Sequence, residues 1–182
     1  MTTMTVMPRE SRDWTVDDID LLPDDGLQYE LLDGLLLVTP APVPVHQRAV
    51  VRMLLLLSEA CTSRFEVFVA PLDWRPDIRT SLQPDLLVVD KDRIGVKNIT
   101  EPLALAVEIL SPSTRRKDMV LKRSKYEDAG VASYWIVDPA APSFVAYDMV
   151  DGRYVEVAAA RDAQTAEVTM PFPARIVPST LV

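Results

Sequence analysis

Two acids and one lysine in the middle of the chain are of the residue types that hold a divalent metal ion and activate water. Asp85 follows a proline and directly precedes an apolar run, and Glu108 lies near the end of the next long apolar run. An ionised carboxylate in such surroundings needs a cation or hydrogen bonds, so both acids are candidate metal ligands. Carboxylate oxygens, with the main-chain carbonyl of Ile109 as a further donor, suit Mg²⁺ or Mn²⁺.

Two strands have to bring those acids together. Residues 86–89 and 103–110 are nearly continuous apolar runs, as expected of central strands covered on both faces. If these strands are antiparallel neighbours, the start of the first lies beside the end of the second. Asp85 and Glu108 then meet at one end of a sheet.

A helix has to supply the lysine. The sequence predicts a helix with its N-cap at position 113 or 114 and its end at Ala129. Asp118, Lys122 and Tyr126 are spaced i, i+4, i+8 and share one face of that helix. Lys122 could direct its ammonium at a metal-bound water or a phosphate oxygen, with Tyr126 in the same network and Asp118 orienting the lysine. The plainer interpretation is a surface pair of Asp118 and Lys122 worth about 0.2–0.5 kcal/mol.

The other patterns predict one α/β domain over residues 1–182, with a mixed β-sheet flanked by helices and additional β-hairpins. A strand at 134–137 would complete a right-handed parallel crossover with the run at 103–110. The remaining expectations are a flexible tail over 1–13, a helix over 15–22, a hairpin of 29–32 and 35–39 around Asp33-Gly34, a helix over 46–61, a strand over 65–70, an irregular segment over 71–82, a hairpin of 144–150 and 154–158, and an edge strand over 165–170.

Composition limits the classes of partner. The net charge of −8 argues against a large basic surface for nucleic acid, but residues 115–125 hold six basic residues against one acid. In that stretch Arg115, Arg116 and Lys117 are candidate phosphate-binding residues. No apolar run is long enough to cross a membrane, and the single cysteine, Cys61, favours a reducing, cytoplasmic location.

Several motifs taken together resemble those of the Uma-type putative restriction endonucleases, which belong to the PD-(D/E)xK nuclease superfamily. The similarity spans most of the chain from about Tyr29 onward, and it is carried by Tyr29-Glu30-Leu31-Leu32-Asp33-Gly34, His46, Pro84-Asp85, Val107-Glu108-Ile109-Leu110-Ser111-Pro112-Ser113-Thr114, Asp118, Lys122, Tyr126, Gly130-Val131 and Tyr134-Trp135-Ile136-Val137-Asp138-Pro139. A second Pro-Asp pair, Pro76-Asp77, lacks a following apolar strand, so Asp85 is the preferred match.

The resemblance implies a sheet flanked by helices, Mg²⁺-dependent hydrolysis of DNA phosphodiester bonds, and a homodimer. It implies that Asp85 and Glu108 are the metal ligands. The superfamily's lysine normally lies two residues after the glutamate, where this chain has Leu110. As in the closer relatives, the lysine role would then pass to Lys122.

Two further residues have open alternatives at this stage. Glu30 is either a third acid near the metal or a cap of the hairpin, and His46 is either part of the site or a local hydrogen-bond donor. The function has alternatives too. Leu110 and the acidic balance favour a catalytically inactive nuclease fold that serves as a binding or assembly module. A two-carboxylate glycosidase is the third interpretation, for which no aromatic sugar-stacking cleft can be identified.

Overall fold

A six-stranded mixed sheet forms the centre of the protein. The computed structural model describes residues 5–7, 13–23, 25–39, 41–111 and 118–182. The strand order is β11-β10-β9-β8-β7-β4, in which β8 and β9 are parallel and the other neighbours are antiparallel. The bounds are β4 Phe65–Val69, β7 Leu86–Asp90, β8 Leu105–Ile109, β9 Ser133–Asp138, β10 Ser143–Val150 and β11 Arg153–Arg161.

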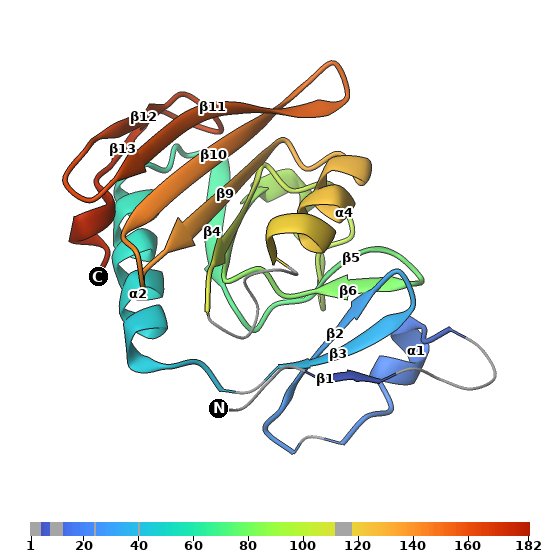
Figure 1. Ribbon diagram of the computed structural model, residues 1–182. Helices are drawn as coiled ribbons and strands as arrows, with labels where there is room; N and C mark the ends of the chain where they lie inside the picture. Colours follow the sequence, from blue (N-terminus) through green and yellow to red (C-terminus); the bar gives the residue numbers. More distant parts are fainter. Residues whose placement is uncertain (1–4, 8–12, 24, 40, 112–117) are drawn as a thin grey trace.

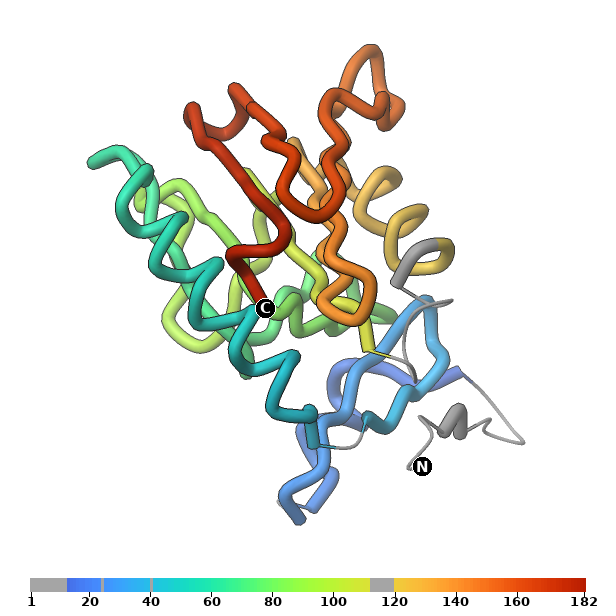
Figure 2. The backbone as a smooth tube through the Cα atoms, turned by 60° about the vertical axis from the view of Figure 1, so that its left-hand side comes forward, coloured from blue at the N-terminus to red at the C-terminus, as the bar shows by residue number. Residues whose placement is uncertain are grey.

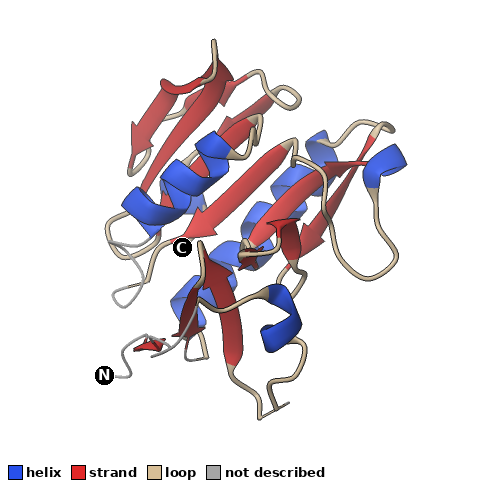
Figure 3. Ribbon diagram, turned by 90° about the vertical axis from the view of Figure 1, so that its right-hand side faces the viewer, coloured by secondary structure: helices blue, strands red, loops and turns tan. Residues whose placement is uncertain are grey.

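Alternation along the central strands explains why both faces of this sheet are covered. Leu105 and Val107 of β8 pack in the same core cluster as the buried apolar residues of α2 (Pro44–Ala60), whereas Ala106 packs with Tyr126 of α4 (Arg123–Asp128). Successive side chains of a strand point to opposite faces, so α2 and α4 lie on opposite sides of the sheet (Figure 1). Figure 3 shows the long helix α2 behind the strands and the shorter helix α4 in front of them.

The parallel crossover from β8 to β9 is confirmed, with α4 on its path. Within the described residues the predicted helix begins with one turn of π-helix, η2 (Asp118–Lys122), and continues as α4. Gly130 follows it with a φ of +75°, the left-handed conformation in which glycine ends helices. The predicted N-cap of this helix lies outside the described residues.

A five-stranded sheet of order β1-β3-β2-β6-β5 packs beside the central one (Figure 1). Its strands are β1 Thr5–Met7, β2 Gln28–Leu32, β3 Leu35–Thr39, β5 Trp74–Asp77 and β6 Thr80–Leu82, and α1 (Val16–Ile19) precedes β2. The hairpin of β2 and β3 is confirmed. Its turn residues Asp33 and Gly34 have φ values of +49° and +86°, as a tight hairpin turn requires.

Two predictions about this sheet were wrong. Residues 71–82 were expected to be irregular but contain β5 and β6. The sequence did not predict these strands because they are too short and too polar to show an alternating pattern. Their anchors are Trp74 and Leu82, both fully buried. In the expected tail, the described residues Thr5–Met7 form a strand that pairs with β3.

The C-terminal part packs against α2. The hairpin of β10 and β11 is confirmed, with longer strands than predicted. The expected edge strand is instead β12 (Ala166–Val168), which pairs with β13 (Ala174–Ile176) in a separate two-stranded sheet. The final turn, η3 (Pro178–Thr180), follows, and Arg52 of α2 donates to the main-chain oxygen of Thr180 at 2.9 Å. Figure 2 shows the C-terminal segment beside α2. Among the described helices none is long and apolar enough to cross a membrane.

Candidate active site

The register of β7 and β8 brings Asp85 and Glu108 together. Leu86 pairs with Val107 in an antiparallel ladder, so the residue before the first and the residue after the second occupy the next pair of positions. The main-chain N–H of Ile109 donates to Oδ2 of Asp85 at 2.7 Å. Asp85 and Glu108 therefore occupy adjacent positions on neighbouring strands at one end of the sheet.

The pleat of β8 decides what Glu108 meets. Glu108 lies on the same face as Ala106 and Leu110, which pack in the cluster that contains Tyr126. That face is the one covered by α4, and Glu108 is only 3% exposed there. A carboxylate so deeply buried needs donors, and the helix provides them.

Lys122 provides the positive charge. Its Nζ donates to Oε1 of Glu108 at 3.1 Å and to Oε1 of Glu30 at 3.0 Å. The lysine is 4% exposed, so the two ion pairs are shielded from water. Lys122 is therefore a buried residue of the site and not an exposed surface lysine.

Tyr126, one helical turn after Lys122, contacts the same oxygen. Its hydroxyl donates to Oε1 of Glu108 at 2.7 Å. Burial raises the pKa of the Tyr126 hydroxyl well above its ordinary value, and the nearby charges of Glu108 and Glu30 raise it further. Tyr126 is therefore a neutral hydrogen-bond donor over the whole physiological pH range.

Glu30 comes from β2 of the second sheet and links three segments. Besides Lys122, its Oε1 accepts the main-chain N–H of Gln83 at 2.8 Å. Gln83 is two residues before Asp85 in the chain, so Glu30 fixes the segment that leads into β7. Glu30 thus contacts Lys122 next to Glu108 and also the main chain of Gln83.

His46 contacts the other end of the site. It lies in the first turn of α2, and its Nε2 is 3.3 Å from Oδ1 of Asp85. The imidazole is largely buried. Asp85 is therefore contacted at both oxygens, by His46 at Oδ1 and by the Ile109 N–H at Oδ2.

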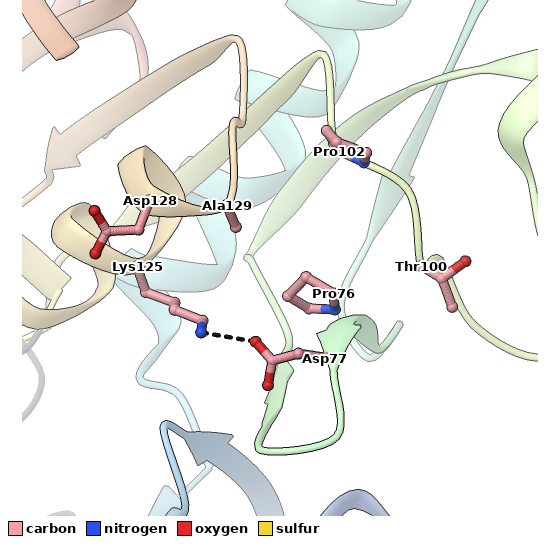
Figure 4. Close-up of a pocket in the computed structure, with 7 residues that line it drawn as sticks. All are labelled: Pro76, Asp77, Thr100, Pro102, Lys125, Asp128 and Ala129. Atoms are coloured by element: carbon pink, nitrogen blue, oxygen red, sulfur yellow. Dashed lines mark hydrogen bonds and ion pairs between the residues drawn. The ribbon is translucent and has the colours of Figure 1, made fainter. Parts of the chain in front are cut away.

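Some predicted residues are not brought to this site or lie outside the description. The side chain of Asp118 and all of Arg115, Arg116 and Lys117 lie outside the described residues. Asp77, from the rival Pro-Asp pair, lies elsewhere and binds Lys125 at 2.8 Å. These two residues line a cavity of about 260 Å³, shown in Figure 4, whose other lining residues are Pro76, Thr100, Pro102, Asp128 and Ala129.

The residues present fit a divalent cation in donor chemistry. Asp85 and Glu108 offer hard oxygen ligands from adjacent positions, and the main chain of Ile109 lies against Asp85. Within the described part of the chain, no group of three or more His, Cys, Asp and Glu side chains is arranged to hold a metal ion. A site here would therefore have two side-chain ligands, completed by main-chain oxygen and water, as is usual for Mg²⁺.

Comparison with known proteins defines the fold and the family. A crystal structure described as a putative nuclease belonging to DUF820, from Anabaena variabilis ATCC 29413, superposes with a TM-score of 0.73 at 18% identity. The match covers 92% of this chain and 96% of that one, and it confirms the restriction-endonuclease-like α/β fold. Among curated proteins none matches the chain. The Uma2 family model, described as "Putative restriction endonuclease", matches residues 16–179. The match spans most of the sequence, and the chain therefore belongs to the Uma2 family of putative restriction endonucleases.

Proposed function

We propose that this protein is a metal-dependent endonuclease that hydrolyses phosphodiester bonds in DNA. The observation that supports this most is the buried carboxylate of Glu108, adjacent to Asp85 and bonded to the ammonium of Lys122. Burying charges costs free energy even when they are paired, and an apolar replacement is often at least as stable. In a chain of this family, a catalytic role best explains such a cluster of buried charges at the end of a sheet.

The formal charge of the site suits a divalent ion. Counted formally, Glu30, Asp85 and Glu108 contribute three negative charges, and Lys122 offsets one of the three. The remaining formal charge of −2 equals what Mg²⁺ or Mn²⁺ would neutralise. Asp85 and Glu108 are the residues that would hold the ion, with the main-chain carbonyl of Ile109. A bound divalent ion lowers the pKa of its water and draws charge from a phosphate oxygen.

Lys122 has the role that the superfamily gives to a lysine two residues after the glutamate. The chain has Leu110 at that position, and the helix brings the ammonium to the same carboxylate from another direction. An ammonium beside the scissile phosphate stabilises the charge that develops on its oxygens during hydrolysis. Glu30 keeps the amine of Lys122 directed at Glu108 before substrate arrives.

Substrate binding is the role proposed for the basic segment before η2. Arg115, Arg116 and Lys117 precede Lys122 by five to seven residues and are proposed to bind neighbouring phosphates of the DNA backbone. Such contacts position a duplex without reading its sequence. The homodimer implied by the family resemblance stays a prediction, and sedimentation of the purified protein checks it.

Cleavage of plasmid and single-stranded DNA in Mg²⁺ or Mn²⁺ tests the proposal. Asp85→Asn should lower the metal-dependent cleavage rate by at least about 10³-fold, since the charge that holds the ion is lost. Asp77→Asn is the matched control, because it changes the other Pro-Asp acid, which binds Lys125 away from the site. Its cleavage rate should stay within about twofold of wild type. Equal cleavage by wild type and Asp85→Asn would contradict the proposal.

The same assay separates the second candidate function, a catalytically inactive nuclease fold used for binding or assembly. Leu110 in place of the usual lysine is the observation that favours it. Calorimetric titration with Mn²⁺ accompanies the cleavage assay for this reason. Cleavage that requires the metal and Asp85 supports the enzyme, whereas absence of both metal binding and cleavage supports the module.

A further inference from the structure

The hydroxyl of Tyr126 and the amine of Lys122 bond to the same oxygen of Glu108. The distances to Oε1 are 2.7 Å from the hydroxyl and 3.1 Å from the amine. The two donors differ in mechanical character. Lys122 reaches Glu108 through a flexible four-carbon chain, whereas the hydroxyl of Tyr126 is carried by a rigid ring.

The ring of Tyr126 packs against two other aromatic rings. Its centroid is 5.4 Å from that of Trp74 and 5.1 Å from that of Tyr134, at interplanar angles of 34° and 40°. All three side chains are fully buried. Trp74 is itself fixed by a hydrogen bond from its Nε1 to the main-chain oxygen of Glu101 at 3.0 Å. The place of the Tyr126 hydroxyl is therefore set by three separate segments of the chain.

This difference matters once substrate is bound. A lysine that stabilises a phosphate has to turn its donors toward the phosphate oxygens, which weakens its hold on Glu108. A second donor that cannot turn away then keeps the carboxylate in place. Ligand carboxylates in metal sites are commonly held by such hydrogen bonds, whose loss typically weakens metal binding by about 10–100-fold.

We propose that Tyr126 is a positioning residue that keeps the carboxylate of Glu108 in its metal-binding orientation, both in the DNA-free protein and while Lys122 serves the phosphate. The inference rests on the proposed metal-dependent function. Tyr126 does not contact the reacting atoms in this proposal. It acts through Glu108, and its contribution is therefore to the affinity for the metal.

The test compares two variants that each remove one buried hydroxyl. Tyr126→Phe removes the donor to Glu108. Tyr154→Phe is the matched control, because Tyr154 belongs to the same aromatic cluster and its hydroxyl donates to the main-chain oxygen of Val131 at 2.9 Å. Both variants should lower the melting temperature by about 2–4 °C, because each loses one buried hydrogen bond.

Calorimetric titration of DNA-free protein with Mn²⁺, well below both melting temperatures, gives the decisive measurement. Tyr126→Phe should bind Mn²⁺ about 10-fold more weakly than wild type, and Tyr154→Phe should bind it as wild type does. Unchanged affinity in Tyr126→Phe, or equal weakening in both variants, would overturn the inference and leave the proposed function standing. A wild-type protein that binds no Mn²⁺ would overturn both.

A second variant covers the case in which Tyr126→Phe fails to fold. Trp74→Phe keeps the hydroxyl of Tyr126 but loosens the packing that fixes its ring. Its affinity for Mn²⁺ should fall by a smaller factor, about threefold. Wild-type affinity in that variant would also overturn the inference.

Discussion

Two lysines three residues apart each bond to two carboxylates, and they do so in opposite surroundings. Lys122 joins Glu30 and Glu108, and the three side chains are 5%, 6% and 4% exposed. Lys125, whose side chain is 13% exposed, joins Asp33 and Asp77 at 2.7 and 2.8 Å, but these acids are 62% and 43% exposed. Distances alone would class the two clusters as equivalent, and burial distinguishes them.

The difference in burial separates the cluster of Lys122, which we propose to be functional, from the cluster of Lys125, which connects structural elements. Ion pairs with exposed partners are screened by water and contribute about 0–1 kcal/mol to stability, so the cluster of Lys125 changes the free energy of unfolding little. It connects α4 to the turn of the β2–β3 hairpin and to the end of β5. The cluster of Lys122 has lost its hydration, which costs several kcal/mol per ion before the pairing offsets it. We propose that these charges are buried, despite that cost, because they take part in catalysis at the end of the central sheet.

The largest expected effect on stability comes from replacing Lys122 with methionine, and the same replacement of Lys125 serves as the comparison. Lys122→Met leaves Glu30 and Glu108 buried without their cation, and we expect the free energy of unfolding to fall by about 3–5 kcal/mol. Lys125→Met leaves two acids that water can solvate, and we expect a loss of at most about 1 kcal/mol. Urea denaturation of the two variants measures the contrast. Equal losses would mean that burial does not distinguish the two clusters.

The double variant Lys122→Met/Glu30→Gln sharpens the same contrast. Removing one of the uncompensated charges should restore part of the lost stability, with an interaction energy of about 1–3 kcal/mol in a double-mutant cycle. The corresponding cycle with Lys125→Met and Asp33→Asn should give less than about 0.5 kcal/mol, because Asp33 is exposed. Strictly additive losses at the buried pair would contradict the assigned coupling. Denaturation in urea at one fixed salt concentration measures both cycles.

The buried cluster was partly predictable from sequence, because much of it follows from local periodicity. Apolar runs identified β7 and β8, and an antiparallel pairing of the two implied that Asp85 and Glu108 converge. Helical spacing placed Lys122 and Tyr126 on one face, and both contact Glu108. Tyr134 and Trp135, in the strand predicted at 134–137, are both fully buried. Periods of two and 3.6 residues carry this kind of information.

The contacts that periodicity could not predict connect distant segments. Glu30 meets Lys122 across 92 residues and Gln83 across 53, and no local pattern encodes such a pairing. The contact of His46 with Asp85 likewise depends on how α2 packs against the sheet. Lys125 pairs with Asp77 because β5 places Asp77 at its end. The sequence did not predict β5 because its four residues, Trp74–Asp77, are too few to show a period of two. Topology supplies these contacts, so only the family pattern pointed to Glu30 and His46.

The smallest expected effect concerns pH and the exposed cluster. Burial alone would raise the pKa of the Asp77 carboxyl, but hydrogen bonds from Lys125 and from the main-chain N–H of Arg79 lower it below its ordinary value of 3.8. A carboxyl whose pKa is lower in the folded state stabilises the fold above its unfolded-state pKa and loses that contribution as pH falls through the folded-state value. Wild type should therefore exceed Asp77→Asn in stability by at most about 1 kcal/mol at neutral pH, since the pair is exposed.

That difference should shrink as pH falls below 3.8, where Asp77 becomes protonated and its bond to Lys125 loses its charge. Urea denaturation of both proteins at neutral pH and at two or three acid pH values measures it. The subtraction removes the protonation of the other carboxylates, which both proteins share. A difference that stays constant with pH would show that Asp77 acts through packing of the β5 turn and not through its charge. Lys125 would then stabilise the position of α4 through its bond to Asp33. The comparison with the buried cluster of Lys122 would in that case depend only on the pair of Lys125 and Asp33.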